Sequence, residues 1–361
     1  MKDLENARAS LEALDRELAA VFGRRMDAAR RVALAKRTLC LHTGEEVDRQ
    51  QDADLAALIE DEEIRAYYPL LQNHLRGLST LLEHRVMDGL RVAYAGVEGA
   101  FAQIAASKIF PDGKTVSYPD FAAAYAAAET GECDCAVLPM ENSYAGDVSQ
   151  VMDLAYFGTL YINGVYDVSI SQCLLGTQDA TLEGVTEVVS HPQALSQCAG
   201  FLAKGGYQLT EASNTAVAAR RVAEAQSPAL AAIGSPEAAE LYGLKVLAPN
   251  INESASNTTR FAVFTRTPSG SARRDGQFIM TFTVKNEAGS LAKAISIIGE
   301  CGFNMRSLKS RPSKNLSWSY YFYVEAEGNL DSEQGRSMLS QLEQICSGLK
   351  ILATYDREIS L

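Results

Sequence analysis

The sequence predicts a multidomain protein, in which an all-α segment precedes an α/β domain and a smaller α+β domain. Three observations support this. Apolar residues recur at helical spacing over residues 1–88, short apolar strands alternate with helices over residues 89–267, and a strand–helix–strand–strand–helix–strand order fills residues 277–361. The length of 361 residues allows two or three domains with full-sized cores.

The first segment is predicted to be helical almost throughout. Its first helix carries an apolar stripe made of Leu4, Leu11, Leu14, Leu18 and Val21. Breaks at Gly44 and near residues 66–69 divide the segment into a long, a shorter and a third helix. Three such helices bury their apolar stripes poorly alone, so we expect the segment to associate with a second copy of the chain.

The middle domain begins near Gly89 and alternates strands with helices. Strands expected at residues 91–95, 136–139 and 185–189 end at a glycine turn, at Glu141 and at Ser190, respectively. Polar residues therefore gather at the C-terminal ends of strands, where open α/β sheets bind ligands. The domain is long enough for two small lobes with a cleft between them.

A polar run over residues 267–276 is predicted to be a linker. The elements after it have the ferredoxin-like order. The expected strands are 278–284, 304–308, 318–326 and 350–355, and the expected helices are 290–301 and 332–346.

Composition excludes several classes of protein. A net charge of -12 disfavours binding to nucleic acid or to anionic membranes, and no glycine-rich phosphate loop with a following lysine occurs. The N-terminus lacks the apolar stretch of a signal peptide, so we expect a cytoplasmic protein. Its cysteines are then expected to be free thiols. They are Cys40, Cys133, Cys135, Cys173, Cys198, Cys301 and Cys346.

Basic residues on the first helix suggest an anion site. Arg25 and Lys36 are 11 residues apart, so they return to nearly one face with Cα atoms ~16 Å apart. Arg8 lies ~26 Å from Arg25 and points elsewhere, so a second chain would have to supply it to the same pocket. A solvated basic face is the alternative interpretation.

The tripeptide Thr259-Arg260-Phe261 opens an apolar strand over residues 261–264. The threonine hydroxyl therefore stands where a loop meets a strand end, a usual position for chemistry in α/β domains. Alone, the tripeptide is also compatible with a simple capped strand end.

Five short motifs, in their order and spacing, resemble one enzyme family over essentially the whole chain. They are Glu141-Asn142-Ser143, Ser190-His191-Pro192-Gln193, Thr259-Arg260-Phe261, Gly289-Ser290-Leu291-Ala292 and Ser310-Arg311-Pro312. The set resembles prephenate dehydratase with a C-terminal ACT domain, and the first ninety residues resemble the all-helical chorismate mutase. The resemblance implies a two-lobed, periplasmic-binding-protein-like fold for the middle domain and a chemistry without cofactor or metal.

For the dehydratase, the resemblance implies that Thr259 donates the proton to the departing hydroxyl group, with Glu141 completing its network. Further residues are expected to act on or orient the substrate. They are Asn142, Ser143, Ser190, His191, Gln193, Gln197, Arg260 and Phe261. Ser190 can instead cap the next helix, His191 can be a structural hydrogen-bonding group, and Arg260 either pairs with a carboxylate or braces its strand.

For the mutase, the resemblance implies a chorismate site with Lys36 at the ether oxygen. The expected ligands are Arg8, Arg25, Lys36, Glu46, Arg49, Gln50, Ser79 and Glu83. Gln50 stands where glutamate is usual, and Glu83 where glutamine is usual. Because a carboxylate donates a hydrogen bond only when protonated, we expect a mutase that is slower at neutral pH than in mild acid.

For the C-terminal domain, the resemblance implies that two copies hold phenylalanine as a feedback inhibitor, in a homodimer or homotetramer. The expected effector-binding residues are Gly289, Leu291, Asn304, Met305, Ser310 and Arg311. Lys309 replaces the usual glutamate before Ser310. Three functions remain open: a bifunctional enzyme, a dehydratase whose helices serve dimerisation, and a non-catalytic amino-acid sensor. Arogenate remains open as a substrate beside prephenate.

Overall fold

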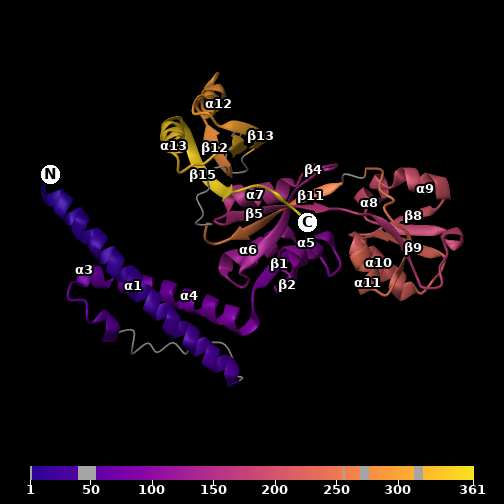
Figure 1. Cartoon of the computed structure of the whole chain (residues 1–361), viewed down its shortest axis with the longest axis horizontal. Coiled ribbons are helices and arrows are strands. Elements are labelled where there is room, and N and C mark those ends of the chain that lie inside the picture. Colours follow the sequence, from indigo (N-terminus) through magenta and orange to yellow (C-terminus); the bar gives the residue numbers. More distant parts are fainter. Residues whose placement is uncertain (1, 40–53, 255–256, 269–275, 313–319) are drawn as a thin grey trace. The chain divides into compact units, whose positions relative to one another are not determined.

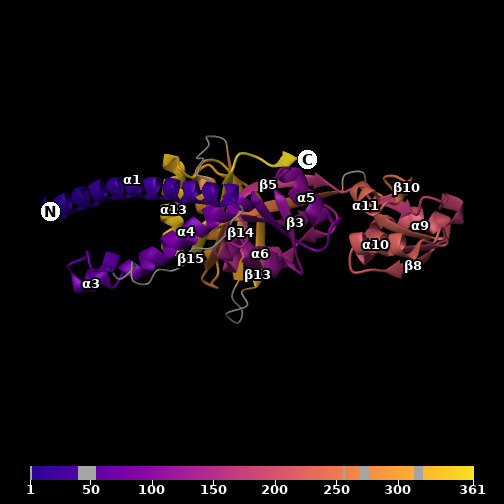
Figure 2. The ribbon, with the colours of Figure 1, turned by 90° about the horizontal axis from the view of Figure 1, so that it is seen from below.

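The computed structural model describes residues 2–39, 54–254, 257–268, 276–312 and 320–361. The chain divides into two compact units, Met1–Arg91 and Val92–Leu361 (Figures 1 and 2). Among the helices of the described residues, none combines the length and apolar character needed to cross a bilayer.

The first unit is helical, as predicted. Its elements are α1 (Lys2–Thr38), α3 (Glu62–Arg65) and α4 (Tyr68–Asp88). The break expected at residues 66–69 separates α3 from α4, whereas the break expected at Gly44 lies outside the described residues. In α1, which is described along its whole length, Ala33 alone is buried. Its side chains Leu11 and Leu14 are 61% and 57% exposed, so the described residues of the helical unit leave the apolar stripe uncovered.

The first lobe of the second unit is a mixed sheet covered by helices. Its elements are β1 (Arg91–Ala95), α5 (Phe101–Ile109), β2 (Lys114–Tyr118), α6 (Phe121–Thr130), β3 (Cys135–Asn142), β4 (Gly146–Asp147), α7 (Ser149–Phe157), β5 (Tyr161–Ser169) and β11 (Thr258–Thr265). The strands lie in the order β5-β11-β3-β1-β2, with β11 antiparallel to both of its neighbours. Alternating apolar residues of β3 and β11 bury Leu138, Ala262 and Phe264 in the core of this lobe.

The second lobe is a separate five-stranded sheet in the order β10-β6-β9-β7-β8. Its elements are β6 (Cys173–Gly176), the 3-10 turn at Leu182–Gly184, β7 (Glu187–Ser190), α8 (Pro192–Gln197), α9 (Ala199–Gly205), β8 (Gln208–Glu211), α10 (Thr215–Ala225), β9 (Leu230–Gly234), α11 (Pro236–Leu241) and β10 (Lys245–Ala248). The chain enters this lobe after β5 and returns from it into β11 (Figure 1). The predicted two-lobed α/β fold is therefore confirmed.

The C-terminal module has the predicted βαββαβ order. Its elements are β12 (Gln277–Val284), α12 (Ser290–Glu300), β13 (Asn304–Pro312), β14 (Tyr320–Glu327), α13 (Glu333–Ile345) and β15 (Cys346–Tyr355). Side chains such as Phe278, Met280 and Phe282 form its core with the two helices. The predicted start of the third strand, Trp318, lies outside the described residues. Strand β13 is longer than predicted, so that Ser310-Arg311-Pro312 lies within it.

The sheet of this module is continuous with the sheet of the first lobe. Strand β15 pairs with β5 at Ala353 and Ile162, and the short strand β16 (Ile359–Ser360) also pairs with β5. On the face away from α12 and α13, Tyr323 packs into the core of the first lobe, and the ring of Tyr321 stacks on Tyr156 of α7 at 3.9 Å. The first lobe therefore covers the face of the module's sheet that its own helices leave open.

Candidate active site

The junction of the two lobes places Thr259 beside Asn142. The residues stand directly opposite each other in the pairing of β11 with β3, although they are far apart in sequence. The Asn142 Nδ2 donates a hydrogen bond to Thr259 Oγ1 at 2.9 Å, and both side chains are buried. The backbone N–H groups of Tyr144 and Ala145 donate to Asn142 Oδ1, which fixes the orientation of the amide.

A chain of buried amides continues from this pair into the second lobe. Asn142 Nδ2 also donates to Asn257 Oδ1 at 2.9 Å, and Asn257 Nδ2 donates to Gln197 Oε1 of α8 at 3.2 Å. Gln172 Nε2 donates to the same Gln197 oxygen at 3.3 Å. The Oε1 atom of Gln172 is buried without a partner in the described part of the chain. Buried polar atoms are normally hydrogen-bonded, so this oxygen is an exception within the amide chain.

The site residues predicted in the second lobe differ from one another in burial and in hydrogen-bond partners. Ser190 is fully buried at the end of β7, where its Oγ donates to the Ile233 carbonyl at 2.8 Å. The interpretation of Ser190 as a helix cap is wrong, because His191 occupies the N-cap of α8 and accepts from the backbone N–H of Gln193. That bond agrees with the alternative of a structural role for His191. The Gln193 side chain is exposed.

Two further predicted residues support the strand ends. The Oγ of Ser143 accepts a hydrogen bond from the backbone N–H of Thr258 at 3.0 Å, which ties the end of β3 to the start of β11. Phe261 is 2% exposed and is among the largest fully buried side chains. The structure thus places Phe261 in the core, where it supports the strand.

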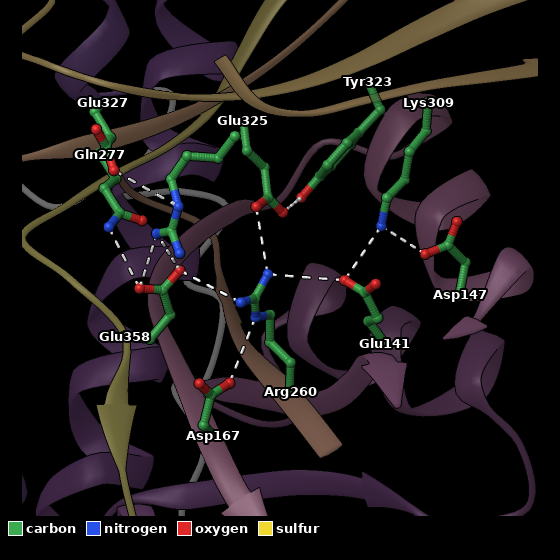
Figure 3. A network of polar contacts seen from close by, with 11 residues as sticks. Glu141, Asp147, Asp167, Arg260, Gln277, Lys309, Tyr323, Glu325, Glu327 and Glu358 are labelled. Atoms are coloured by element: carbon green, nitrogen blue, oxygen red, sulfur yellow. Dashed lines mark hydrogen bonds and ion pairs between the residues drawn. The ribbon is translucent and has the colours of Figure 1, made fainter. Parts of the chain in front are cut away.

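Glu141 and Arg260 lie on the other face of the same strands. Successive side chains of a strand point to opposite faces, so each is turned away from its neighbour, Asn142 or Thr259. The Glu141 carboxylate lies 3.2 Å from Lys309 Nζ and 3.7 Å from Arg260 Nη1 (Figure 3). The expectation that Glu141 completes the Thr259 network is therefore not met: the strand alternation directs its carboxylate to the C-terminal module.

A cavity of about 470 Å³ lies between the two lobes. It is lined by residues of α5 and α11 and of the turn before α5, including Glu98, Gly99 and Glu237. Gly99 has a φ of +83°, and a Cβ atom there would lie 3.1 Å from the Leu241 side chain of the second lobe. The glycine turn thus allows the lobes to approach closely at the edge of their cleft.

Four of the residues expected for the mutase meet between α1 and α4. The Arg25 Nη1 donates to Ser79 Oγ at 2.8 Å, and Lys36 Nζ lies 2.8 Å from Glu83 Oε1. Ser79 and Glu83 are 5% and 7% exposed. Arg8 is exposed further along α1 and is not part of this cluster. The remaining residues, Glu46, Arg49 and Gln50, lie outside the described residues.

The residues expected to bind the effector are spread over the C-terminal module. Gly289 and Asn304 stand at opposite ends of α12, which extends over roughly 16 Å at 1.5 Å per residue. Leu291 and Met305 are packed against the core, and Ser310 is exposed. Arg311 points into the first lobe, where its Nε donates to Asp153 Oδ1 at 2.9 Å. One small ligand cannot contact both ends of α12 within a single chain.

Sequence reasoning missed Asn257 and Gln172. Asn257 stands two residues before Thr259, and a period of two along an extended chain places both on one side. That spacing was a signal available in the sequence. Gln172 lies in the connection after β5, where no periodic pattern marks its direction.

Known proteins resemble this chain in sequence and in fold. The family model described as prephenate dehydratase matches residues 92–269. The chain is 33% identical over 299 residues to arogenate dehydratase/prephenate dehydratase 2 of Arabidopsis thaliana, covering 80% of this chain and 78% of the relative. It is 29% identical over 376 residues to the bifunctional chorismate mutase/prephenate dehydratase of Escherichia coli, covering 97% and 95%. The crystal structure of prephenate dehydratase in complex with L-Phe from Arthrobacter aurescens has a TM-score of 0.70 at 24% identity, covering 74% of this chain and 90% of that one.

Proposed function

We propose that this chain, which belongs to the prephenate dehydratase family, is a bifunctional enzyme. In this proposal the helical unit rearranges chorismate to prephenate, and the two-lobed domain converts prephenate to phenylpyruvate. The observation that carries the proposal is the buried Thr259–Asn142 pair, which stands at the lobe junction at the end of a chain of amides.

The geometry of this pair suits proton donation to a leaving hydroxyl group. Asn142 donates to the Thr259 oxygen, so the threonine proton remains available to an acceptor outside the pair. In the reaction the ring carboxylate leaves as carbon dioxide, its bonding electrons enter the ring, and the ring hydroxyl leaves as water after gaining a proton. Aromatisation drives this loss, and burial favours it by removing water from the carboxylate.

The dehydratase test follows the products from purified protein. With prephenate we expect phenylpyruvate, and with arogenate the corresponding product is phenylalanine. The ratio of kcat/KM for the two substrates defines the preference. A chain that releases neither product is not a dehydratase, and the amino-acid sensor then becomes the better interpretation.

The mutase proposal rests on the cluster between α1 and α4. Arg25 is positioned to bind a carboxylate of chorismate, and Lys36 to stabilise negative charge on the breaking ether oxygen. The bifunctional relative of Escherichia coli aligns over 97% of this chain, helical unit included. Consumption of chorismate by the full chain tests the proposal. If chorismate is unchanged while prephenate is converted, the helices serve association only.

A second copy of the chain is part of this proposal. The uncovered leucines of α1 provide an apolar face, and Arg8 lies too far along the helix to reach its own chain's Arg25. We infer a dimer in which Arg8 of one chain completes the mutase site of the other. Sedimentation of the purified chain measures the state of association.

We also propose that the C-terminal module is an ACT domain that binds phenylalanine between two copies. The separation of Gly289 from Asn304 by the length of α12 supports a site shared by two chains. A glycine with φ of +84° precedes α12, and a helix N-terminus favours a carboxylate. Titration of dehydratase activity with phenylalanine tests this, with Asn304→Ala expected to weaken inhibition.

A further inference from the structure

Figure 3 shows a group of charged residues that joins the first lobe to the C-terminal module. We call it the Arg260 cluster. Its members are Glu141, Asp147, Asp167, Arg260, Lys309, Glu325 and Glu358.

Arg260 makes ion pairs on both sides of this boundary. Within the first lobe, its guanidinium lies 3.7 Å from Glu141 and 3.4 Å from Asp167. Across the boundary, it lies 3.3 Å from Glu325 of β14 and 3.5 Å from Glu358, which follows β15. The guanidinium group therefore has carboxylate partners already and is turned away from the Thr259 hydroxyl.

The cluster is attached directly to the backbone that carries the catalytic pair. In the pairing of β11 with β3, Thr259 stands opposite Asn142, and the next residues, Arg260 and Glu141, stand opposite each other. The register of this pairing shifts at a β-bulge directly after Arg260. A shift of either charged side chain therefore acts on the strand position next to a catalytic residue.

The charges of the cluster make Arg260 hard to replace. Carboxylates outnumber cations, so removal of Arg260 leaves Glu141 and Asp167 facing Glu325 and Glu358 with less compensation. Glu325 is 5% exposed and is held by the Tyr323 hydroxyl, which donates to Oε1 at 2.6 Å. Burial acts to raise the pKa of Glu358, but hydrogen bonds and the charges of Arg306 and Arg260 lower it overall.

Lys309 adds a second link from the C-terminal module. Its Nζ lies 3.2 Å from Glu141 and 2.5 Å from Asp147 of β4. Glu141 is thus held between Lys309 of the module and Arg260 of its own lobe.

We propose that Arg260 is a positioning residue of the dehydratase, and that Glu325 and Glu358 of the C-terminal module act through it on the Thr259–Asn142 pair. This inference rests on the proposed dehydratase function. It assigns the module a role in basal catalysis, separate from any effector.

The test compares Arg260→Met, Glu325→Gln and the double variant in the full chain, with prephenate and without phenylalanine. We expect kcat to fall about 10- to 100-fold in Arg260→Met and about three- to tenfold in Glu325→Gln, with KM changed by less than about twofold. Because both residues act through one contact, the double variant should resemble Arg260→Met alone.

Controls separate positioning from misfolding. Arg260→Lys keeps the charge and should recover part of kcat, and Glu300→Gln, which removes an exposed carboxylate at the end of α12, should match the wild type. Thermal unfolding verifies that each variant is folded at the assay temperature.

Two outcomes would overturn the inference. A large rise in KM with kcat retained in Arg260→Met would make Arg260 a substrate ligand. An unchanged kcat in Glu325→Gln would show that Glu325 of the module does not act on catalysis. Multiplicative effects in the double variant would show that Arg260 and Glu325 act independently. An inactive wild-type chain would instead refute the proposed function.

Discussion

In the two-lobed domain, the site residues are held by buried strands of the same chain, whereas in the helical unit they lie on helices whose apolar side chains remain exposed. Thr259 and Asn142 are each less than one-tenth exposed. The Arg25–Ser79 and Lys36–Glu83 contacts are also formed within the chain, but Leu11, Leu14 and Leu18 of the same helix are exposed. The candidate site of the two-lobed domain is thus formed within one chain, whereas the helical site is expected to need a second.

The largest expected effect is on the dehydratase reaction alone, and it therefore distinguishes the two-lobed domain from the helical unit. Replacing Thr259 with valine removes the proposed proton donor but keeps the volume, so dehydratase kcat should fall by roughly 10³-fold. Mutase activity of the same preparation should not change. Thr265→Val, at the other end of β11, is the matched control. Near-normal turnover of prephenate by Thr259→Val would contradict the assignment.

The complementary variant removes a charge from the helical site. Arg25→Ala takes away the proposed ligand of a chorismate carboxylate, and mutase kcat/KM should fall roughly 100-fold while dehydratase activity stays constant. The adjacent Arg24 is exposed, so Arg24→Ala should leave both activities unchanged. Equal effects of the two variants would support a solvated basic face.

A third variant tests whether the helical site depends on a second chain. Leu14→Lys places a charge in the uncovered apolar stripe, and we expect roughly tenfold weaker self-association with a parallel loss of mutase activity. Ala9→Lys adds the same charge on another side of α1, because five residues at 100° each turn the helix by about 140° beyond one full turn. Sedimentation at several concentrations, with both activities, distinguishes these outcomes. A fully active monomer would contradict the shared site.

The smallest expected effect is a gain. Glu83→Gln supplies a side chain that donates a hydrogen bond at any pH, so mutase activity at neutral pH should rise about two- to fivefold. The acid-side increase expected for the wild type should disappear in the variant. A pH profile of kcat for both proteins checks this. A wild-type profile that is flat or rises toward alkaline pH would argue against a role for Glu83 as donor.

Much of the fold could be predicted because periodicity reports local structure directly. The helical segment, strands β1, β3 and β11 of the first lobe, and the βαββαβ order each have a clear apolar pattern. The pairing of β11 with β3 could not be predicted, because it joins Thr259 to a residue more than a hundred positions away. The attachment of β15 to β5 likewise depends on the edge of one sheet meeting another, which no local pattern encodes.

The residue types of the candidate site were predicted, but the directions in which their side chains point were not. Glu141 and Asn142 were grouped because they are adjacent, and the strand was expected to end before them. Since β3 continues to Asn142, the alternation of side chains sends one to the amide chain and the other to Lys309. The same reasoning places Thr259 and Arg260 apart.

The pairing of β5 with β15 and β16 also determines where the protein can be cut. Truncation after β11 would expose a bare strand edge, with its N–H and C=O groups unpaired along Ile162 and Tyr166–Asp167. Such an edge is a template for aggregation, so a shortened enzyme would tend to precipitate even with its catalytic residues intact. A soluble fragment of the catalytic lobes would need a substitute strand or charged residues along that edge.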